Sequence, residues 1–381
     1  MSRTTILGSS LRLHSMPIAL SLVLILIALV ATVVQSSSFD RTVIDLLIRV
    51  VFVVALYIFV GNSGVVSFGH AAFMMIGAYA TGWQDCCSMT KSFFMPGLPQ
   101  FMLDTTVPPP IATVVSGLFA ALFALLVGAA IMRLSGIGAS IATFAMLVVV
   151  NVIYSNWDSV TAGTSTMTGI PAFTDRWVAL LVAVIAIFVA YLYQISRFGL
   201  MLRTSREDEI AAKASGVDVI GQRLSAFVLS AFFAGVAGGL YAHFLGTISV
   251  NAFYLDLTFI TLAMLVVGGM NSLSGAVIGV ICITALVEIL RHLERGIEIG
   301  STSIVLPGGA QEIGLGIALV LVLIFRQRGI TGNQEITWPP SRVMEKPERI
   351  QDVDRAQTTS PPPPASRWRY LSKVIKQGGV P

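Results

Sequence analysis

The sequence predicts an all-α, polytopic bundle of transmembrane helices, and two observations carry this prediction. Of the 381 residues, 55% are apolar and only 12% are charged, whereas roughly 25% of an average soluble domain is charged. The mean hydropathy is +0.82, and apolar runs long enough to cross a bilayer recur along the chain. Together they exclude a soluble enzyme, a disordered protein and a nucleic-acid-binding domain as descriptions of the whole chain.

A helix that crosses the hydrocarbon core needs about 20 mostly apolar residues. Runs of this kind are expected near residues 16–35, 42–60, 65–82, 111–132, 137–156, 177–195, 224–246, 257–271, 275–291 and 311–326. Glycine interrupts the runs near 65–82 and 257–291. The sequence therefore predicts about ten spans, with eight or nine as alternatives.

The first run could instead be a signal peptide. Its apolar stretch, from Pro17 to Val34, is longer than the apolar region of a signal peptide, which runs about 7–15 residues. No small-x-small cleavage site follows it. These features favour a retained anchor over a signal peptide.

Lysine and arginine in the loops predict the orientation, because cytoplasmic loops carry an excess of both. Together the loops 83–110 and 157–176 hold only two basic residues, whereas ten follow from residue 326 onwards. The loop 196–223 holds Arg197, Arg203, Arg206, Lys213 and Arg223. We therefore expect this loop and both termini in the cytoplasm, an arrangement that ten crossings satisfy.

The expected organisation is a cytoplasmic N-terminus (1–15), a transmembrane domain (16–326) that contains the cytoplasmic loop 196–223, and a proline-rich basic tail (327–381). We expect this tail to be cytoplasmic and disordered, with SPPPP acting as a stiff, extended linker. After it, Trp368, Leu371 and Ile375 would share one helical face. Such a helix could lie on an anionic membrane surface, and a disordered basic segment is the alternative.

Sequence motifs for catalysis or nucleotide binding are missing. No Gly-x4-Gly-Lys-Ser/Thr occurs and no lysine follows a glycine, so the chain lacks a phosphate-binding P-loop. Neither His-Glu-x-x-His nor Gly-x-Ser-x-Gly is present, the four histidines are scattered, and the three cysteines lack metal-ligand spacing. We expect no catalytic residue, metal or cofactor, and inert cysteines.

The ionisable residues within the expected spans are mainly Asp45, Arg49, His70 and Glu288. Each is costly in hydrocarbon and marks an ion or proton relay by default. However, Asp45 and Arg49 are four apart on one helix face, and Glu288 lies close to Arg291 and His292. Local pairs are therefore favoured over a relay. A proton-driven pump would need more charge at mid-depth, so we expect an external energy source.

Within the basic loop, the stretch TSREDEIAAKASGV predicts a helix of about eleven residues. Thr204 or Ser205 can cap it, with Glu207 or Asp208 as the capping-box partner. Gly216 suits the left-handed terminating position. An isolated helix this short is marginal in water, so it needs a surface to dock against. Close approach is permitted by Ala211, Ala212 and Ala214.

Two polar interruptions pair Asn-Ser with glycine, GNSG at 61–64 and GGMNS at 268–272. Matching interruptions in two halves of a transporter point to a binding or gating site, since non-helical backbone at membrane depth needs cover from protein or a wet cavity. The alternative is two short turns between helices. The substrate-path candidates here are Asn62, Ser63, Asn271 and Ser272.

Four more polar residues are path candidates. Ser67 and His70 follow the first interruption on one helix face, and Thr143 and Asn151 lie in the next glycine-led helix. A charged solute needs such groups or water, because each unpaired charge costs several kcal/mol in hydrocarbon. The alternative for each is a satisfied interhelical hydrogen bond.

The stretch EIAAKASG resembles the Glu-Ala-Ala-x-x-x-Gly loop of ABC importer permeases, which forms a coupling helix seated on the ATP-hydrolysing subunit. Ala211, Ala212 and Gly216 match in register. Ile210 occupies the slot of the glutamate, and Glu209 lies one residue early. The resemblance implies that Glu209, Ala211, Ala212 and Gly216 couple this chain to an ATPase.

Longer blocks resemble the branched-chain amino acid permeases, the LivM-like membrane components, over roughly residues 45–330. The blocks are GNSGVVSFGHAAFMMIGAYATG, GIGASIATFAM, TAGTSTMTGIP, the stretch 196–242, VVGGMNSLSGAVIG and GGAQEIGLGIALVLVLIFRQRGI, in this order. The departures are local. Residues 164–167 are poorer in glycine than is usual, Gln327 stands where proline is common, and the tail past 335 matches nothing known.

The resemblance implies a permease subunit of a bacterial ABC importer in the inner membrane. Its expected partners are a second homologous permease, two ABC ATPase subunits, an external solute-binding protein and the lipid bilayer, with no nucleic acid. The expected substrate is leucine, isoleucine, valine or a related small amino acid. A urea or short-amide permease is the nearest alternative, followed by a secondary transporter or channel and, more distantly, a membrane enzyme.

Overall fold

The structure is a computed structural model. It describes residues 15–86, 88–295, 297–299, 302–304, 309, 313–314, 316–317, 320, 324–326, 329–332 and 335. The elements are α2 (Ser15–Val34), α3 (Ser37–Ser63), α4 (His70–Asp85), α5 (Ser88–Phe94), α6 (Gln100–Asp104), α7 (Pro109–Ile131), α8 (Gly136–Asn156), α9 (Asp158–Thr161), β1 (Met167–Thr168), α10 (Arg176–Ile195), α11 (Arg197–Glu207), α12 (Glu209–Ala214), α13 (Val219–Leu245), β2 (Thr247–Ile248), the 3-10 helix η1 (Val250–Phe253), α14 (Leu255–Gly268), α15 (Leu273–Arg295), β3 (Ile297–Ile299) and β4 (Thr302–Ile304).

The described residues include eight helices that are long and apolar enough to cross a membrane. They coincide with eight of the predicted runs, although several begin one to about two helical turns earlier. The all-α prediction is confirmed: in the described part of the chain, the strands form only two short antiparallel pairs, β1 with β2 and β3 with β4. Of the run predicted near 311–326, only residues 313–314, 316–317, 320 and 324–326 are described, and the others lie outside the described residues.

The run predicted near 65–82 is only partly helical. The chain from residue 64 to residue 69 is not helical, and α4 has 16 residues, which corresponds to about 24 Å against a hydrocarbon core of about 30 Å. The prediction of a helix from 65 onwards is wrong. Gly64, with φ +72°, ends α3, and the N–H groups of Val65 and Phe68 then donate to the hydroxyls of Ser63 and Thr143, so α4 starts only at His70. All residues of α4 except Trp83 are buried, so α4 lies inside the bundle.

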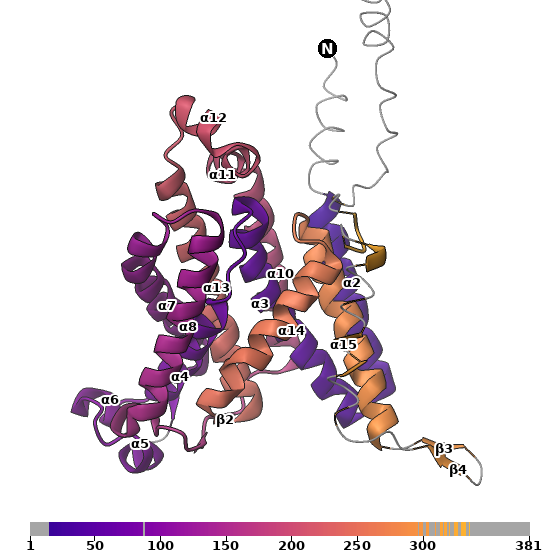
Figure 1. Cartoon of the computed structure of the whole chain (residues 1–381). Coiled ribbons are helices and arrows are strands. Elements are labelled where there is room, and N and C mark those ends of the chain that lie inside the picture. The colour runs from indigo at the N-terminus through magenta and orange to yellow at the C-terminus, as the bar shows by residue number, and fades with distance from the viewer. Residues whose placement is uncertain are drawn as a thin grey trace, which may run out of the picture. The chain divides into compact units, whose positions relative to one another are not determined.

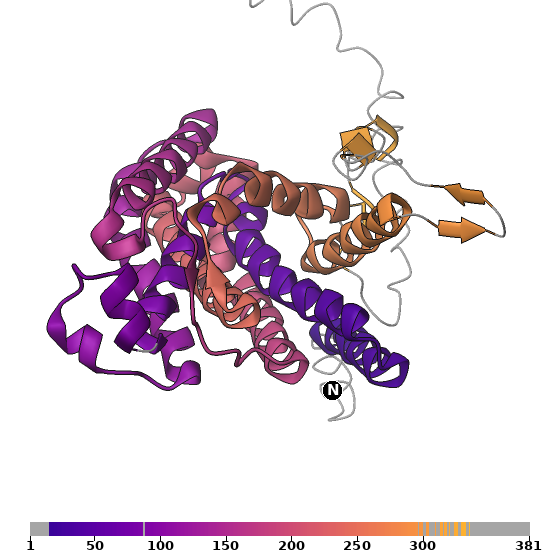
Figure 2. The ribbon, with the colours of Figure 1, turned by 90° about the horizontal axis from the view of Figure 1, so that it is seen from below.

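The bundle is organised around α3 and α13. Helix α13 packs against α3, α4 and α7, and α3 also contacts α10, α14 and α15. A Cβ atom on Gly77 of α4 would overlap the backbone of Gly235 in α13, so these two helices touch backbone to backbone. Figure 2 shows α15 (orange) beside α2 and α3 (indigo), away from α7 and α8 (magenta).

The outer faces of several helices are apolar. Large exposed hydrophobic side chains include Leu26 on α2, Leu126 on α7, Ile141 on α8 and Leu181 on α10. Apolar surface of this extent is rare on soluble monomers and common where a protein faces lipid. Helices α11 and α12 lie at one end of the helices, and α5, α6, β3 and β4 lie at the other (Figure 1).

Candidate functional site at two helix breaks

Both predicted interruptions are breaks in the helical backbone. Helix α3 continues through Asn62 to Ser63, so the first break covers residues 64–69 and begins three residues later than GNSG suggests. The second break covers residues 269–272. It begins with Gly269, φ +124°, and ends where α15 starts.

The end of α3 and the second break lie next to each other. A Cβ atom on Gly61 would approach the carbonyl oxygen of Met270 to 2.8 Å. The guanidinium of Arg206 joins the two segments, because Nη1 donates to the carbonyl oxygen of Gly61 at 2.7 Å and to Oδ1 of Asn271 at 3.2 Å. Segments separated by about 200 residues in the sequence therefore share one cationic donor.

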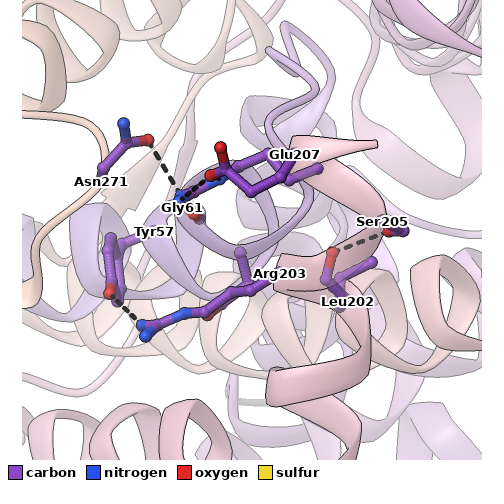
Figure 3. Close-up of polar contacts among 9 residues, drawn as sticks. Tyr57, Gly61, Leu202, Arg203, Ser205, Glu207 and Asn271 are labelled. Carbon is purple, nitrogen blue, oxygen red and sulfur yellow. Dashed lines mark hydrogen bonds and ion pairs between the residues drawn. The ribbon is translucent and has the colours of Figure 1, made fainter. Parts of the chain in front are cut away.

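Arg203 holds the same end of α3 one turn earlier on α11. Its Nε donates to Oδ1 of Asn62 at 2.9 Å, and its Nη2 donates to the hydroxyl of Tyr57 at 3.2 Å (Figure 3). Asn62 is fully buried, and its amide also donates to the carbonyl oxygen of Ile58. We call Tyr57, Gly61, Asn62, Arg203, Arg206 and Asn271 the arginine cluster.

The arginine cluster connects α3, α11 and the second break at one end of the bundle. Hydrogen bonds from a charged donor contribute more than neutral ones, about 1.5–3 kcal/mol each. These hydrogen bonds can therefore hold the end of α3 against the second break while α11 stays in place. Movement of α11 would withdraw both guanidinium groups together.

A short segment near residue 330 packs on the second break. The backbone N–H of Ile330 donates to the carbonyl oxygen of Val267 at 2.8 Å, and the hydroxyl of Thr331 lies 2.9 Å from that of Ser272. The carboxylate of Glu335 accepts hydrogen bonds from the backbone N–H groups of Leu273 and Ser274, at the start of α15. A carboxylate is favourable at a helix N-terminus.

The predicted boundary at residue 327 assigns this segment to the tail. In the structure, residues 329–332 and Glu335 belong to the helical bundle. Glu335 also accepts a hydrogen bond from Gln194 at 2.9 Å. The rest of the predicted tail lies outside the described residues, as does the N-terminus before Ser15.

Of the other path candidates, His70 makes an interhelical hydrogen bond. The two ring nitrogens of His70 lie 2.8 Å from the hydroxyl of Ser67 and 2.9 Å from that of Ser230. The ring also packs against Phe59 and Phe227. Ser67 and His70 therefore contact each other, but Ser67 lies in the first break and not, as was predicted, on the helix of His70. Through Ser230, the ring of His70 connects α4 to α13 among aromatic rings.

Ser63 and Thr143 bind the backbone of the first break, and Asn151 does not. The hydroxyl of Ser63 accepts from the N–H of Val65 at 3.2 Å, and that of Thr143 accepts from the N–H of Phe68 at 3.3 Å. Asn151 lies eight residues further along α8, about 12 Å away. Its buried side-chain nitrogen has no hydrogen-bond partner among the described residues.

The basic loop forms two helices, so the prediction of a single capped helix there is wrong in detail. Asp208 separates α11 from α12 and caps α12, its carboxylate accepting from the N–H groups of Ile210 and Ala211 at 2.9 Å. Thr204 and Ser205 instead bond to backbone carbonyls within α11. Asp208 is the cap because its backbone is extended, which directs its carboxylate towards those two N–H groups.

The four predicted coupling residues lie together on α12 and its end. Hydrogen bonds from Lys213 and Arg223, both at 2.8 Å, hold the pKa of the Glu209 carboxyl below its usual value. Gly216 has φ +83°, which confirms the predicted left-handed termination. Ala212 is buried and Ala211 is exposed.

The outer surface of α12 carries both apolar and polar groups. Ile210 is 83% exposed, and a shallow groove nearby is lined by the apolar Leu200, Met201, Ala211, Ala212 and Val217 and by the polar Thr204, Glu207, Asp208 and Ser215. A large exposed apolar side chain such as Ile210 at the end of a bundle suits a protein-binding surface.

Several residues of the site could not be picked out from the sequence. In the sequence, Arg203 and Arg206 stand out only as part of the positive charge of the loop. Their spacing of three residues indicates that they share one face of a helix, but not what they contact. Tyr57 lies in an apolar run, and Glu335 lies in the predicted tail. Neither carried a local signal, because their partners are distant in the sequence.

Among the described residues, the eight long apolar helices and the two helix breaks are typical of a polytopic membrane transport protein. The model of one family, described as the permease component of branched-chain amino acid transport systems, matches residues 38–324. The chain belongs to this family, which confirms the family resemblance of the sequence blocks.

Individual relatives agree with this family. The high-affinity branched-chain amino acid transport system permease protein LivM of Escherichia coli is 26% identical over 318 residues, covering 74% of this chain and 68% of the relative. A probable LivM permease of Methanocaldococcus jannaschii is 27% identical over 176 residues, covering 44% and 50%. The nucleoside ABC transporter permease protein NupC of Lactococcus lactis is 35% identical over 107 residues, covering 28% and 31%. No solved structure matches the chain significantly.

Proposed function

We propose that this chain is the membrane-spanning permease subunit of an ATP-driven ABC importer for branched-chain or related small amino acids. The family and the names of the LivM relatives support this substrate class. The absence of a P-loop from the sequence supports an energy source on a separate ATPase subunit.

The observation that carries the mechanism is the pair of arginines on α11. Arg203 and Arg206 donate to α3 and to the second break, while α12 follows α11 after a single residue, Asp208. A displacement of α12 by a partner would move α11 and withdraw both guanidinium groups. Binding and hydrolysis of ATP on the partner would then open and close one end of the path.

Helix α12 is the proposed docking element for the ATPase. It exposes Ile210, and its N-terminus is fixed by Asp208. Glu209 anchors it to Arg223 at the start of α13. This gives α12 a defined orientation, so a force applied to its outer surface reaches the bundle.

We place α11, α12 and both termini in the cytoplasm of a bacterial cell, with the protein in the inner membrane. The loop charges support this orientation. The functional complex would contain a second homologous permease, two ABC ATPase subunits and an external solute-binding protein. This chain would contribute half of the translocation path and one docking helix.

The test is co-purification followed by reconstitution in proteoliposomes. The assembled complex should show ATPase activity stimulated by leucine, isoleucine or valine with the solute-binding protein, and it should import them. The panel includes urea, a short amide and a nucleoside. Stimulation by one of these three alone would overturn the substrate class. Uphill uptake by this chain alone under an ion gradient would overturn the ATP-driven mechanism.

A further inference from the structure

The second break leaves backbone groups without helical partners on both of its sides. Helix α14 ends at Gly268 and α15 begins at Leu273. The last carbonyl groups of α14 and the first N–H groups of α15 therefore have no partners within their own helices. Val267, Gly268 and Leu273 are buried, and a buried backbone group without a partner is unfavourable. The break thus needs partners from another part of the chain.

Residues 329–332 provide partners on the α14 side. The backbone N–H of Ile330 donates to the carbonyl oxygen of Val267 at 2.8 Å, and the N–H of Thr331 donates to that of Gly268 at 3.2 Å. The hydroxyl of Thr331 also donates to the carbonyl oxygen of Gly268, at 2.9 Å. This segment therefore satisfies both of these carbonyl groups at the end of α14.

The same segment lies directly against the break. Gly329 has φ +72°, and a Cβ atom on it would lie 2.6 Å from the Cα atom of Gly269, so a larger residue does not fit there. The hydroxyl of Thr331 lies 2.9 Å from that of Ser272. Ser272 in turn accepts from the N–H of Gly275 at 3.0 Å. The segment therefore contacts both the first and the last residue of the break.

Glu335 provides partners on the α15 side. Its Oε1 accepts from the N–H of Leu273 at 2.9 Å, and its Oε2 accepts from the N–H and the hydroxyl of Ser274 at 3.2 and 3.1 Å. Oε1 also accepts from the side-chain amide of Gln194 on α10 at 2.9 Å. One carboxylate thus satisfies the first two N–H groups of α15 and connects this helix to α10. We call residues 329–332 and Glu335 the clasp.

The clasp meets the arginine cluster at Tyr57. The hydroxyl of Tyr57 lies 3.4 Å from Oε1 of Glu335 and accepts from Nη2 of Arg203 at 3.2 Å. Arg206 binds Asn271 within the same break. The second break is therefore held from two directions, by α11 through Arg206 and by the clasp through the ends of α14 and α15.

Hydrogen bonds rather than apolar burial hold the clasp in place. Ile330 is 39% exposed, and Thr331 and Glu335 are only partly buried. Segments with little buried apolar surface open at low cost, and water can replace each hydrogen bond when such a segment leaves. The clasp can therefore be released while the helices around it stay folded.

We propose that the clasp is a releasable lock on the second break and that Glu335 is its positioning residue. When bound, the clasp satisfies the helix ends on both sides of the break and keeps them in place. Its release leaves these backbone groups to water, which an open path supplies, and frees the break to move away from the end of α3. The inference rests on the proposed function, because a lock has a role only if the break moves during transport. A clasp that merely caps α14 and α15 would stay bound throughout the transport cycle, and this difference is measurable.

Labelling of the clasp tests its release. Thr331→Cys is introduced in a background without other cysteines, and the complex with its ATPase subunits is placed in lipid nanodiscs. The rate of reaction with a maleimide is compared without nucleotide and with ATP and vanadate, which arrests hydrolysis. The two rates should differ several-fold, because Ser272 and Gly268 shield position 331 only while the clasp is bound. Met89→Cys on α5, where Met89 is 88% exposed, is the control and should react equally in both states.

Substitution of Glu335 tests the positioning role. Glu335→Ala removes the acceptor of Leu273 and Ser274, so the break should close incompletely and the amount of leucine imported per ATP hydrolysed should fall several-fold. A substitution that only destabilises the subunit would lower import and ATP hydrolysis together, at an unchanged ratio. Glu335→Gln retains one acceptor oxygen and should lose less. Asp104→Ala and Arg133→Ala, at exposed charged residues outside the clasp, should keep the ratio of the unmodified complex.

Import by the unmodified complex separates this inference from the proposed function. If it imports leucine while Thr331→Cys reacts equally in both states, the clasp is a fixed cap, so the lock is overturned and the importer remains. If the labelling rates differ but Glu335→Ala keeps the ratio, the role of Glu335 is overturned. If the unmodified complex imports no amino acid, the proposed function fails, and the labelling rates, which require no substrate, still decide whether the clasp is released. Unequal labelling rates together with a lowered ratio in Glu335→Ala support the proposal.

Discussion

Arg203 and Arg206 each join α11 to more than one group of the neighbouring segments through a single side chain. Each guanidinium has several donors fixed in a plane. Arg203 donates through Nε and Nη2 to Asn62 and Tyr57, and Arg206 donates through Nη1 to Gly61 and Asn271 and through Nη2 to its neighbour Glu207. A lysine could not reproduce this geometry, because its ammonium group is a compact point charge.

Removing Arg206 should impair transport more than assembly. Arg206→Ala leaves the carbonyl oxygen of Gly61 and the amide of Asn271 without their shared donor, at a cost of about 1–3 kcal/mol. Leucine import by reconstituted complexes should fall about tenfold with unchanged subunit stoichiometry. Arg133→Ala is the control. Import at the unmodified rate would argue against a role for the cluster.

The two asparagines of the cluster should differ in importance. Asn62 is fully buried and uses both its oxygen and its nitrogen, whereas Asn271 is only half buried. Substrate-stimulated transport should therefore fall more in Asn62→Ala than in Asn271→Ala, because Asn62→Ala leaves a partly buried arginine donor without its acceptor. Initial rates of leucine uptake, normalised to the amount of complex, measure the order. The reverse order would be inconsistent with the burial argument.

At the scale of elements, α12 depends on its cap. The helix has six residues, which is too short to be stable without external support. Asp208→Ala removes both capping hydrogen bonds, which costs about 0.5–2 kcal/mol. The affinity of the ATPase subunit for the permease, measured by titration in detergent, should fall several-fold. Asp208→Asn retains an acceptor and should bind nearly normally, and equal losses in the two variants would exclude capping as the cause.

The sequence predicted most elements because membrane helices follow from apolar length alone. The predictions from the sequence were less accurate for the ends of helices, which depend on the backbone conformation of a few residues. GNSG suggested an interruption from residue 61, yet helix geometry persists to Ser63 because only Gly64 takes the left-handed conformation. Similarly, Thr204 and Ser205 were the predicted caps, yet Asp208, predicted only as a capping-box partner, is the cap because its backbone is extended there.

At the scale of the whole molecule, α11 and α12 lie at the end of the bundle away from α5 (Figure 1). Ile210 on α12 and Met89 on α5 are 83% and 88% exposed, so cysteines there should react readily. In intact cells, a membrane-impermeant maleimide should label Met89→Cys and spare Ile210→Cys in a background without other cysteines. Inverted vesicles should reverse the pattern. Labelling of Ile210→Cys from outside would contradict the proposed orientation.

Only part of the candidate site is predictable from the sequence, because the residues that it connects are far apart in the chain. Asn62, Asn271 and Ser272 stand out because polar residues next to glycine interrupt apolar runs. Their connection does not stand out, since Arg206 lies 65 residues from Asn271 and 145 from Gly61. Contacts at such separations follow from the packing of α3, α11 and the second break, which no local pattern encodes.

The proposed mechanism requires α11 to move relative to the end of α3 during transport. A Cβ atom at Gly64 lies 3.6 Å from the Cβ atom of Arg206, within the range of about 3.5–4.5 Å that a disulfide requires. The double variant Gly64→Cys and Arg206→Cys, with Cys86, Cys87 and Cys282 replaced by serine, can therefore lock α11 to α3. Leucine import by the reconstituted complex is measured before oxidation, after oxidation and after reduction, with each single variant as a control. We expect oxidation to abolish the import that the reduced double variant retains, and reduction to restore it. Import at the same rate in the fully oxidised and reduced states would contradict the account.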